Sequence, residues 1–306
     1  LVVGLVLVGS FIWWERRASE PVLPPRLFRI DIFKVSSGLA FLQAMAMFGA
    51  IVFLPFYLQL AHGASVTASG LLLTPMMAGM LVTSIVSGRL VSRTGHYKIF
   101  PIVGTVAMGI GMFLMTSLAA DTSYVRFSID LLLLGAGMGL VMQNTVLATQ
   151  NAVDVRDMGT ATSGLTFFRS LGAVFGTAFF GAIFLNRVNA WLARLLPPSA
   201  RSHVRATAGG FNLSPDAIRH LPAPVRDAVT GSFVHAIDTV FWVALPLSMV
   251  TFVLALVLRE QKLRESAGIF GGPEDGSGDD LEPATGQGEL ALVAETVAPA
   301  GVDLGE

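Results

Sequence analysis

Charged side chains are rare in the long apolar stretches of this 306-residue sequence, and the few found there are its first candidates for chemistry. Asp130 lies six residues into an apolar stretch that begins near Tyr124, and Arg126 precedes it by four residues. This spacing places both side chains on one face of a helix, where they can form an ion pair. We interpret the pair as structural. Cation recognition or proton handling by Asp130 is the alternative, because a charge within a long apolar stretch is costly and, if that stretch spans a membrane, usually functional.

A second carboxylate, Asp238, is predicted to lie at the start of the last apolar stretch, with His235 one helical turn before it. We favour an interfacial helix cap or loop anchor as the role of Asp238. A proton site is the alternative.

Side-chain amides lie within or at the ends of the apolar stretches. Hydrogen bonds between helices explain most such residues, among them Gln59 and Gln150. Gln43, Gln143 and Asn144 are also candidates for lining a central cavity on a substrate or proton pathway. The segment 45–57 is rich in Met and aromatic residues, which suits an adaptable pocket for hydrophobic compounds and equally suits contact with lipid.

Two pairs of glycines recur at four-residue spacing, Gly135 with Gly139 and Gly172 with Gly176. Such pairs let two helices approach closely in a membrane. The first pair, with Gly137 between its members, does not form a nucleotide-binding loop, because no strand precedes it and the spacing is not GxGxxG. We therefore predict that all four paired glycines lie at helix contacts.

The composition excludes several classes of function. Hydrophobic residues make up 53% of the chain and charged residues 13%, and the mean hydropathy is +0.67, whereas soluble domains carry about 25% charged residues. A net charge of −1 gives no signal for nucleic acid, and the absence of cysteine removes thiol chemistry. Motifs for zinc proteases, serine hydrolases and phosphate-binding loops are absent, and Asp130 and Asp238 lack the flanking pattern of an intramembrane aspartyl protease. We expect a membrane protein that is not an enzyme and has no cofactor or metal.

Six apolar stretches are each long enough to cross a hydrocarbon core of about 30 Å as a helix. They are residues 35–60, 68–90, 99–118, 125–149, 164–185 and 233–258. Helices are the expected form, because a backbone in lipid must satisfy its own hydrogen bonds. The sequence thus predicts an all-α polytopic membrane protein with a six-helix bundle over residues 35–258. Residues 1–14 are expected to be the end of a truncated transmembrane helix, so that the chain is a fragment.

The distribution of Lys and Arg predicts the orientation of the bundle. Alternating crossings place twelve basic residues on the side that holds residues 15–34, and the short turns 61–67 and 119–124 on the other side hold none. The basic side is therefore expected to be cytoplasmic, with residues 15–34 as a cytoplasmic linker. Residues 186–232 are expected to form a long outer loop, partly helical and lying on the membrane surface. Residues 259–306 are expected to form a disordered, acidic cytoplasmic tail.

One short inner turn, GRLVSRTGHYK at residues 88–98, is unusually basic and is bracketed by glycines. Gly88 is expected to let two helices approach closely, and Gly95 to take a positive φ in a tight turn. Arg89 or Arg93 can bond carbonyls at neighbouring helix ends. Alternatively, the turn serves only to fix the orientation of the chain in the membrane.

This turn resembles the signature of the major facilitator superfamily, Gly-x-Leu-Ala-Asp-Arg-x-Gly-Arg-Lys/Arg-x, and it matches at Gly88, Leu90, Arg93 and Gly95. Ser92 stands where the family has Asp, so the salt bridge of that Asp is not carried over. Three further segments resemble the fourteen-spanner drug:proton antiporters (EmrB/QacA-like). They are residues 54–59 (LPFYLQ), 68–75 (ASGLLLTP) and 159–172 (GTATSGLTFFRSLG).

The resemblance implies that the chain is the carboxy-terminal half of a proton-coupled multidrug exporter in the cell membrane. The inner turn, with Gly88, Arg89, Arg93, Gly95 and Lys98, would latch this half to an amino-terminal transmembrane half during alternating access. The implied partners are that half, membrane lipid, protons and a hydrophobic or cationic small molecule. A metabolite importer of the same fold and a non-transporting membrane scaffold or sensor are the alternatives.

Deleting residues 265–306 from the full-length protein distinguishes a transporter from a scaffold that works through its acidic tail. We expect most of the transport flux to remain, because the predicted pathway lies in the bundle. Flux is measured in membrane vesicles at matched protein levels. Loss of function with the protein still present in the membrane would favour the scaffold.

Overall fold

The computed structural model describes residues 24–61, 63–118, 122–195 and 222–262, together with positions 4, 9, 10, 13 and 14 near the start of the chain. Most of the predicted truncated helix and much of the predicted linker lie outside these residues. So do the middle of the predicted outer loop and nearly all of the predicted tail. The assignments of these segments stay predictions.

The described residues form helices joined by turns. Five segments are long and apolar enough to cross a membrane: Asp31–Leu60, Val66–Thr94, Tyr124–Ala152, Val155–Leu195 and Val225–Val257. The individual helices are η1 (Leu27–Arg29), α2 (Asp31–Ile51), α3 (Leu54–Ala61), α4 (Val66–Leu71), α5 (Thr74–Thr94), α6 (Ile99–Met115), α7 (Tyr124–Ala152), η2 (Val155–Asp157), α8 (Met158–Leu195) and α11 (Ala223–Val257).

The all-α, multi-pass membrane fold predicted from the sequence is confirmed. The sixth apolar helix, α6, has 17 residues and ends three residues before the predicted boundary. At about 1.5 Å per residue it is about 25 Å long. Residues 116–118 continue it as a turn rather than as regular helix.

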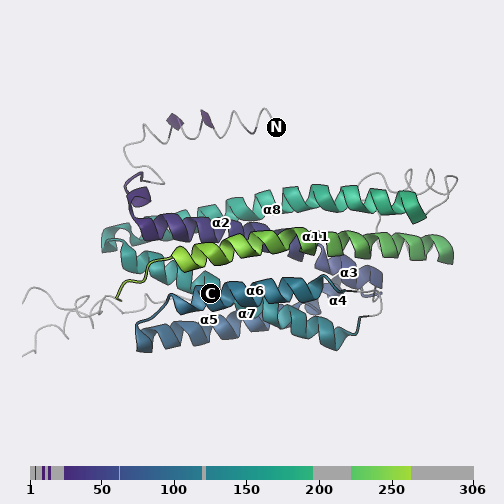
Figure 1. The fold of residues 1–306 in the computed structure, drawn as a ribbon, viewed down its shortest axis with the longest axis horizontal. Coiled ribbons are helices and arrows are strands. Elements are labelled where there is room, and N and C mark those ends of the chain that lie inside the picture. Colours follow the sequence, from purple (N-terminus) through teal and green to yellow (C-terminus); the bar gives the residue numbers. More distant parts are fainter. Residues whose placement is uncertain are drawn as a thin grey trace, which may run out of the picture. The chain divides into compact units, whose positions relative to one another are not determined.

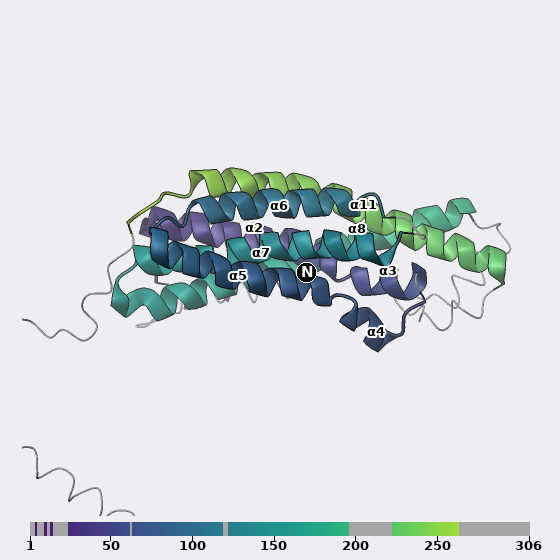
Figure 2. The same cartoon turned by 90° about the horizontal axis from the view of Figure 1, so that it is seen from below.

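The long helices pack in two groups and run side by side in both views (Figures 1 and 2). In one group α2 and α11 pack on α8, and in the other α5 and α6 pack on α7. Contacts of α11 with α6 and of α2 with α7 join the groups. The α5–α6 turn, the α7–α8 turn and the segment after α11 meet at one end, which we call the basic end. The opposite end, with the α6–α7 connection, is the far end.

Pro55 divides the first spanning segment into two helices. Because proline has no N–H to donate to the carbonyl of Ile51, and its ring displaces that carbonyl, regular helix stops before it. Val52 and Phe53 form the turn between α2 and α3. Beyond the break, α3 lies against α11, and its Tyr57 ring lies 5.5 Å from the ring of Phe127 in α7.

Glycines bring α7 directly against the backbone of α5. A Cβ added at Gly135 would overlap the carbonyl oxygen of Met76, and one added at Gly139 would overlap that of Met80. In the same contact, Thr83 Oγ1 of α5 donates a hydrogen bond to a backbone carbonyl of α7, 2.9 Å away. The two helices are therefore held at backbone-to-backbone distance.

The contact between α8 and α2 is built in the same way. A Cβ at Gly172 would overlap the carbonyl oxygen of Phe41, and one at Gly176 would overlap that of Met45. Because lipid gives no hydrophobic driving force between helices, close van der Waals packing of this kind supplies much of their association.

The helices α8 and α11 extend beyond the others at the far end (Figure 1). The sequence predicted a loop over residues 186–232, but α8 remains helical to Leu195 and α11 begins at Ala223. Pro222 caps α11 and a proline lies in its first two positions, which favours a helix start there. Asp238 lies fifteen residues after that start, so the prediction that it begins the last helix is wrong.

Replacing Gly135 by Ala tests the α5–α7 contact. The added methyl group must push α5 away from α7, and overpacking of this kind costs about 1–3 kcal/mol. We expect a lower thermal unfolding midpoint for the full-length protein in detergent.

Gly181 of α8 is the matched control, because it is also buried in a helix but has no atom within 4 Å of an added Cβ. Gly181→Ala should keep or raise the midpoint, since Ala favours helix over Gly by about 0.5–1 kcal/mol. Equal midpoints for the two variants would contradict the packing described.

Candidate functional site

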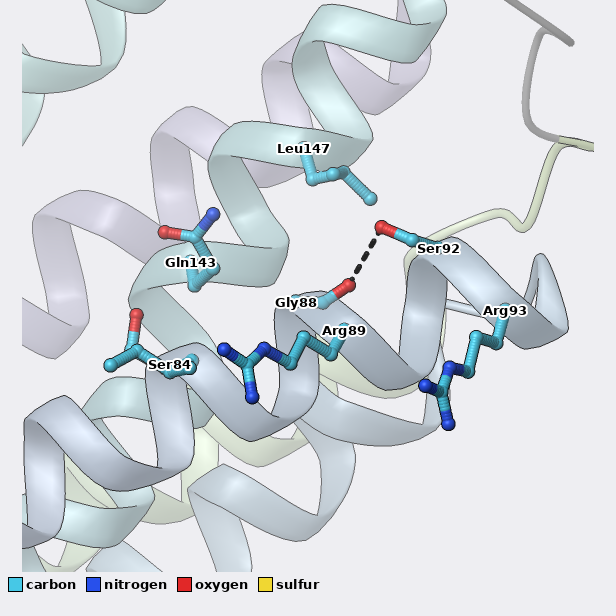
Figure 3. A pocket seen from close by; sticks show the side chains of 8 residues that line it. Ser84, Gly88, Arg89, Ser92, Arg93, Gln143 and Leu147 are labelled. Carbon is cyan, nitrogen blue, oxygen red and sulfur yellow. Dashed lines mark hydrogen bonds between the residues drawn. The ribbon is translucent and has the colours of Figure 1, made fainter.

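An open groove of about 520 Å³ lies between α5 and α7 near the basic end (Figure 3). Arg89 and Arg93 lie on the α5 side of the groove, and their side chains run in the same direction (Figure 3). The hydroxyl of Ser92 donates to the carbonyl of Gly88 within α5, 2.9 Å away. The groove is lined by Ser84, Ile85, Gly88, Arg89, Ser92 and Arg93 of α5 and by Gln143 and Leu147 of α7.

The groove is electropositive. Arg89 and Arg93 are exposed, and neither forms a salt bridge in the part of the chain that the structure describes. Ser92, at the position of the family Asp, uses its hydroxyl within its own helix and supplies no opposing charge. The groove can therefore receive an anionic group that the described residues do not supply.

Gly88 and Gly95, which bracket the basic segment 88–98, have different roles. A Cβ at Gly88 would have one neighbour, the Cγ of Gln143 at 4.0 Å, so Gly88 makes no close contact between the described helices. Gly88 instead leaves the floor of the groove open. Gly95 takes a φ of 74° and its N–H donates to the carbonyl of Val91 at 2.8 Å, which ends α5 with a left-handed cap. Lys98 is the residue that directly precedes α6.

Tyr97, in the turn between α5 and α6, connects this turn to the segment that follows α11. Its ring is fully buried, and its hydroxyl donates to the carbonyl of Arg259 and accepts from the N–H of Gln261, both at 2.9 Å. The Asn151 amide of α7 donates to the carbonyl of Lys262 at 3.1 Å. The segment that leaves α11 is thus bonded to the α5–α6 turn and to the last turn of α7. The sequence did not reveal this role of Tyr97.

Asp130 is buried in α7, with 3% of its surface exposed. The predicted ion pair with Arg126 does not form: the Arg126 guanidinium donates to Ser117 Oγ at 2.5 Å, and no salt bridge joins it to Asp130 among the described residues. Arg126 lies at the far end, where its long side chain can reach Ser117 and water. Asp130 points inward instead, and its Oδ2 atom is buried without a hydrogen-bond partner.

The three candidate amides do not share one cavity. Gln43 is buried and its Nε2 donates to the carbonyl of Met138 at 3.4 Å, which links α2 to α7. Asn144 is fully buried and donates to the carbonyl of Leu140 at 2.7 Å, while its Oδ1 has no partner. Gln143, the next residue along α7, is exposed on the groove.

Gln59 and Gln150 form hydrogen bonds between helices, as predicted. Gln59 donates to Ser69 of α4 and Gln150 to Thr162 of α8, each at 3.1 Å. The half of the bundle nearer the basic end also buries hydroxyl oxygens without partners at Ser36, Ser37 and Thr149. Small hydroxyl residues are common in membrane helices, so no signal in the sequence distinguished these three. No cluster of His, Asp and Glu in the described ranges could hold a metal ion.

Comparison with known proteins identifies the family. The model of the Major Facilitator Superfamily matches residues 1–177, more than half of the chain. The chain belongs to the Major Facilitator Superfamily.

Curated relatives cover most of this chain, which spans about 38–52% of the length of these relatives. An uncharacterized MFS-type transporter of Mycobacterium tuberculosis is 42% identical over 265 residues, 87% of this chain and 38% of that protein. The multidrug transporter protein MdtP of Bacillus subtilis is 35% identical over 85% of this chain and 52% of its own length. The MFS efflux transporter aclA of Aspergillus oryzae is 30% identical over 86% of this chain and 49% of its own length.

Solved structures share the fold. The fucose:proton symporter FucP of E. coli superposes with a TM-score of 0.57 at 19% identity, over 76% of this chain and 50% of FucP. A bacterial homologue of the human lysosomal transporter Spinster superposes with a TM-score of 0.53 at 14% identity, over 74% of this chain and 48% of the homologue. In both comparisons this chain corresponds to about half of a transporter fold.

Replacing Tyr97 by Phe tests its role at the basic end. Loss of the hydroxyl leaves one carbonyl and one N–H without their partner, which we expect to cost about 1 kcal/mol of folding free energy. The midpoint of thermal unfolding at neutral pH measures this loss. Tyr124→Phe is the control, because the Tyr124 hydroxyl makes one longer bond, 3.2 Å to the carbonyl of Leu72. A larger loss for Tyr124→Phe would contradict the assignment.

Tyr97→Phe also tests how the stability of the protein depends on pH in the alkaline range. Burial raises the pKa of the Tyr97 phenol, although the N–H of Gln261 acts in the opposite direction. A phenol pKa that is higher in the folded than in the unfolded state stabilises the protein below about pH 10, and this stabilisation is lost as the pH rises further. Wild type should therefore lose more stability than Tyr97→Phe between about pH 9 and pH 11. An equal loss would show that Tyr97 does not carry this effect.

Proposed function

We propose that this chain is the carboxy-terminal six-helix half of a fourteen-spanner transporter that exports hydrophobic, often cationic, compounds in exchange for protons. The observation that carries the proposal is Asp130, a buried carboxylate in a membrane-spanning helix with one oxygen that has no partner. The names of two relatives, a multidrug transporter and an efflux transporter, favour export.

The chemistry of such a carboxylate suits exchange. An ionised carboxylate buried without a partner costs several kcal/mol, so a proton, a cationic ligand or water must accompany it. A proton and an organic cation cannot both neutralise the same charge. Binding of one therefore favours release of the other, which is the thermodynamic basis of antiport. Because the sequence has no phosphate-binding loop for ATP, an ion gradient is the expected energy source.

The groove fits a contact with the amino-terminal half. In alternating access one helix bundle rocks against the other around a midplane site. Arg89, Arg93 and Lys98 at the basic end would hold an anionic group of that half in one state and release it in the other, and the open position at Gly88 leaves room for the contact. The surface of α5 beyond the groove is apolar and exposed, which suits packing against a second bundle or lipid. It is formed by Met77, Leu81, Val82, Val86 and Leu90.

The proposed orientation places the basic end in the cytoplasm and the far end outside the cell membrane. The clustering of basic side chains at one end of the bundle supports this orientation through the positive-inside rule. The tail that follows residue 262 would then begin on the cytoplasmic side. Protons would enter the pathway from the far end and leave at the basic end.

The test uses the full-length protein in inside-out membrane vesicles with an acidic interior. Ethidium should dissipate the pH gradient in wild-type vesicles, because each cation taken up exchanges for protons. In Asp130→Asn vesicles ethidium should have at least a tenfold smaller effect, since the amide cannot release a proton. A fluorescent pH indicator follows the gradient.

Asp227→Asn is the control, because this carboxylate is exposed at the far end beside Arg226. It should respond to ethidium as wild type does. Dissipation by all three proteins would keep the exporter and remove Asp130 from the proton pathway. No response from folded wild type to ethidium or to other lipophilic cations would contradict multidrug export.

A further inference from the structure

Asp238 is a second carboxylate in a membrane-spanning helix. It is half-buried, and the exchange proposed above leaves it without a role. Its Oδ1 atom is buried and has no hydrogen-bond partner. Asp238 lies in the interior of α11, so backbone N–H groups of a helix start are not available to it. A helix cap is therefore excluded as its function.

The surroundings of Asp238 are apolar. Val234, Phe241 and Leu245 lie on the same stripe of α11, at the spacing of helical turns, and all three belong to or pack on the main hydrophobic core. The core fills the part of the bundle nearer the far end and includes Phe53, Tyr57, Phe127, Phe180, Phe184 and Phe241. The side of α11 that carries Asp238 therefore packs on a core of mainly apolar side chains.

No cation on the neighbouring elements neutralises Asp238. Within the described ranges α6 contains no ionisable residue, α3 presents the buried Tyr57, and the charged residues of α2 lie at the basic end. On α8, Arg169 is half-buried nearer the basic end, and Arg187 and Arg194 are exposed at the far end. None of the three forms a salt bridge with Asp238. The charged groups of α7 are Arg126, which donates to Ser117, and Asp130, which carries the same charge as Asp238.

His235 lies about one helical turn nearer the far end of α11 than Asp238. It is exposed, and at three residues' spacing it shares one side of α11 with Asp238. Its ring stacks on Trp191 of α8, with centroids 4.3 Å apart and planes at 19°, and the Arg194 guanidinium lies 5.3 Å from the same indole. Stacking holds the imidazole at the boundary between the core and the far-end surface.

We propose that Asp238 is a second proton-binding carboxyl group, loaded from the far end through His235. An imidazolium N–H bond breaks and a carboxyl O–H bond forms, so that a neutral imidazole and a neutral carboxyl group replace a pair of charges. Asp130 and Asp238 each lie about 30 Å along their helices from the basic end, at about 1.5 Å per residue. The inference rests on the proposed function and extends it, because the exchange then moves two protons in each cycle.

Infrared difference spectroscopy of the full-length protein in lipid tests the proposal without transport. Protonated carboxyl groups give a carbonyl band that shifts when H₂O is replaced by D₂O. We expect Asp238→Asn to remove a component of this band comparable with that lost in Asp130→Asn. Asp227→Asn should remove none. His235→Gln should keep the component and slow its shift in D₂O at least severalfold.

An Asp238→Asn spectrum that superimposes on wild type would overturn the proposal. If that variant does not fold, Asp238→Glu serves, because it keeps a carboxyl group. Its band should move in frequency, and an unmoved band would overturn the proposal equally. Loss of the Asp238 component together with no ethidium-dependent proton flux in wild-type vesicles would support the second proton site while contradicting the proposed exchange.

Discussion

The need to satisfy backbone hydrogen bonds in lipid is the constraint on which this structure depends. An unpaired N–H or C=O in hydrocarbon costs several kcal/mol, so every long apolar stretch is helical. Where Pro55 interrupts the first spanning segment, the N–H of Val52 still donates to Phe48 and that of Tyr57 to Phe53, at 3.3 and 3.1 Å. Since lipid does not drive apolar helices together, glycines that admit backbone-to-backbone contact decide which helices pair.

The pairing of α5 with α7 connects the buried carboxylate Asp130 to the basic groove. Gly135 and Gly139 allow α7 to pack directly against the backbone of α5, so the two helices pack as one unit. Asp130 lies on this unit toward the far end, and Arg89 and Arg93 lie on it at the basic end. A change of charge at the carboxylate and a change of contact at the groove would therefore act on the same body, as rocking of one half against the other requires.

The sequence was sufficient for the fold, because hydropathy, helix length and glycine spacing are local properties. It was not sufficient for the polar contacts. Arg126 pairs with Ser117 rather than Asp130 because a long side chain near the far end can choose among partners that the sequence does not rank. Asp238 was assigned to a helix start because the prolines that begin α11 fall in a polar, arginine-rich segment. The bond from Tyr97 to Arg259 joins residues 162 positions apart, which no local pattern reveals.

Proton release on substrate binding distinguishes the proposed exporter from other members of the same fold. Ethidium is added to the purified full-length protein in weakly buffered detergent solution containing a pH indicator. An antiporter in which the cation and the proton compete for buried carboxylates should release protons and acidify the solution, in proportion to the protein. Uptake of protons on substrate binding, as in a symporter, or binding of ethidium with no proton movement would contradict the mechanism.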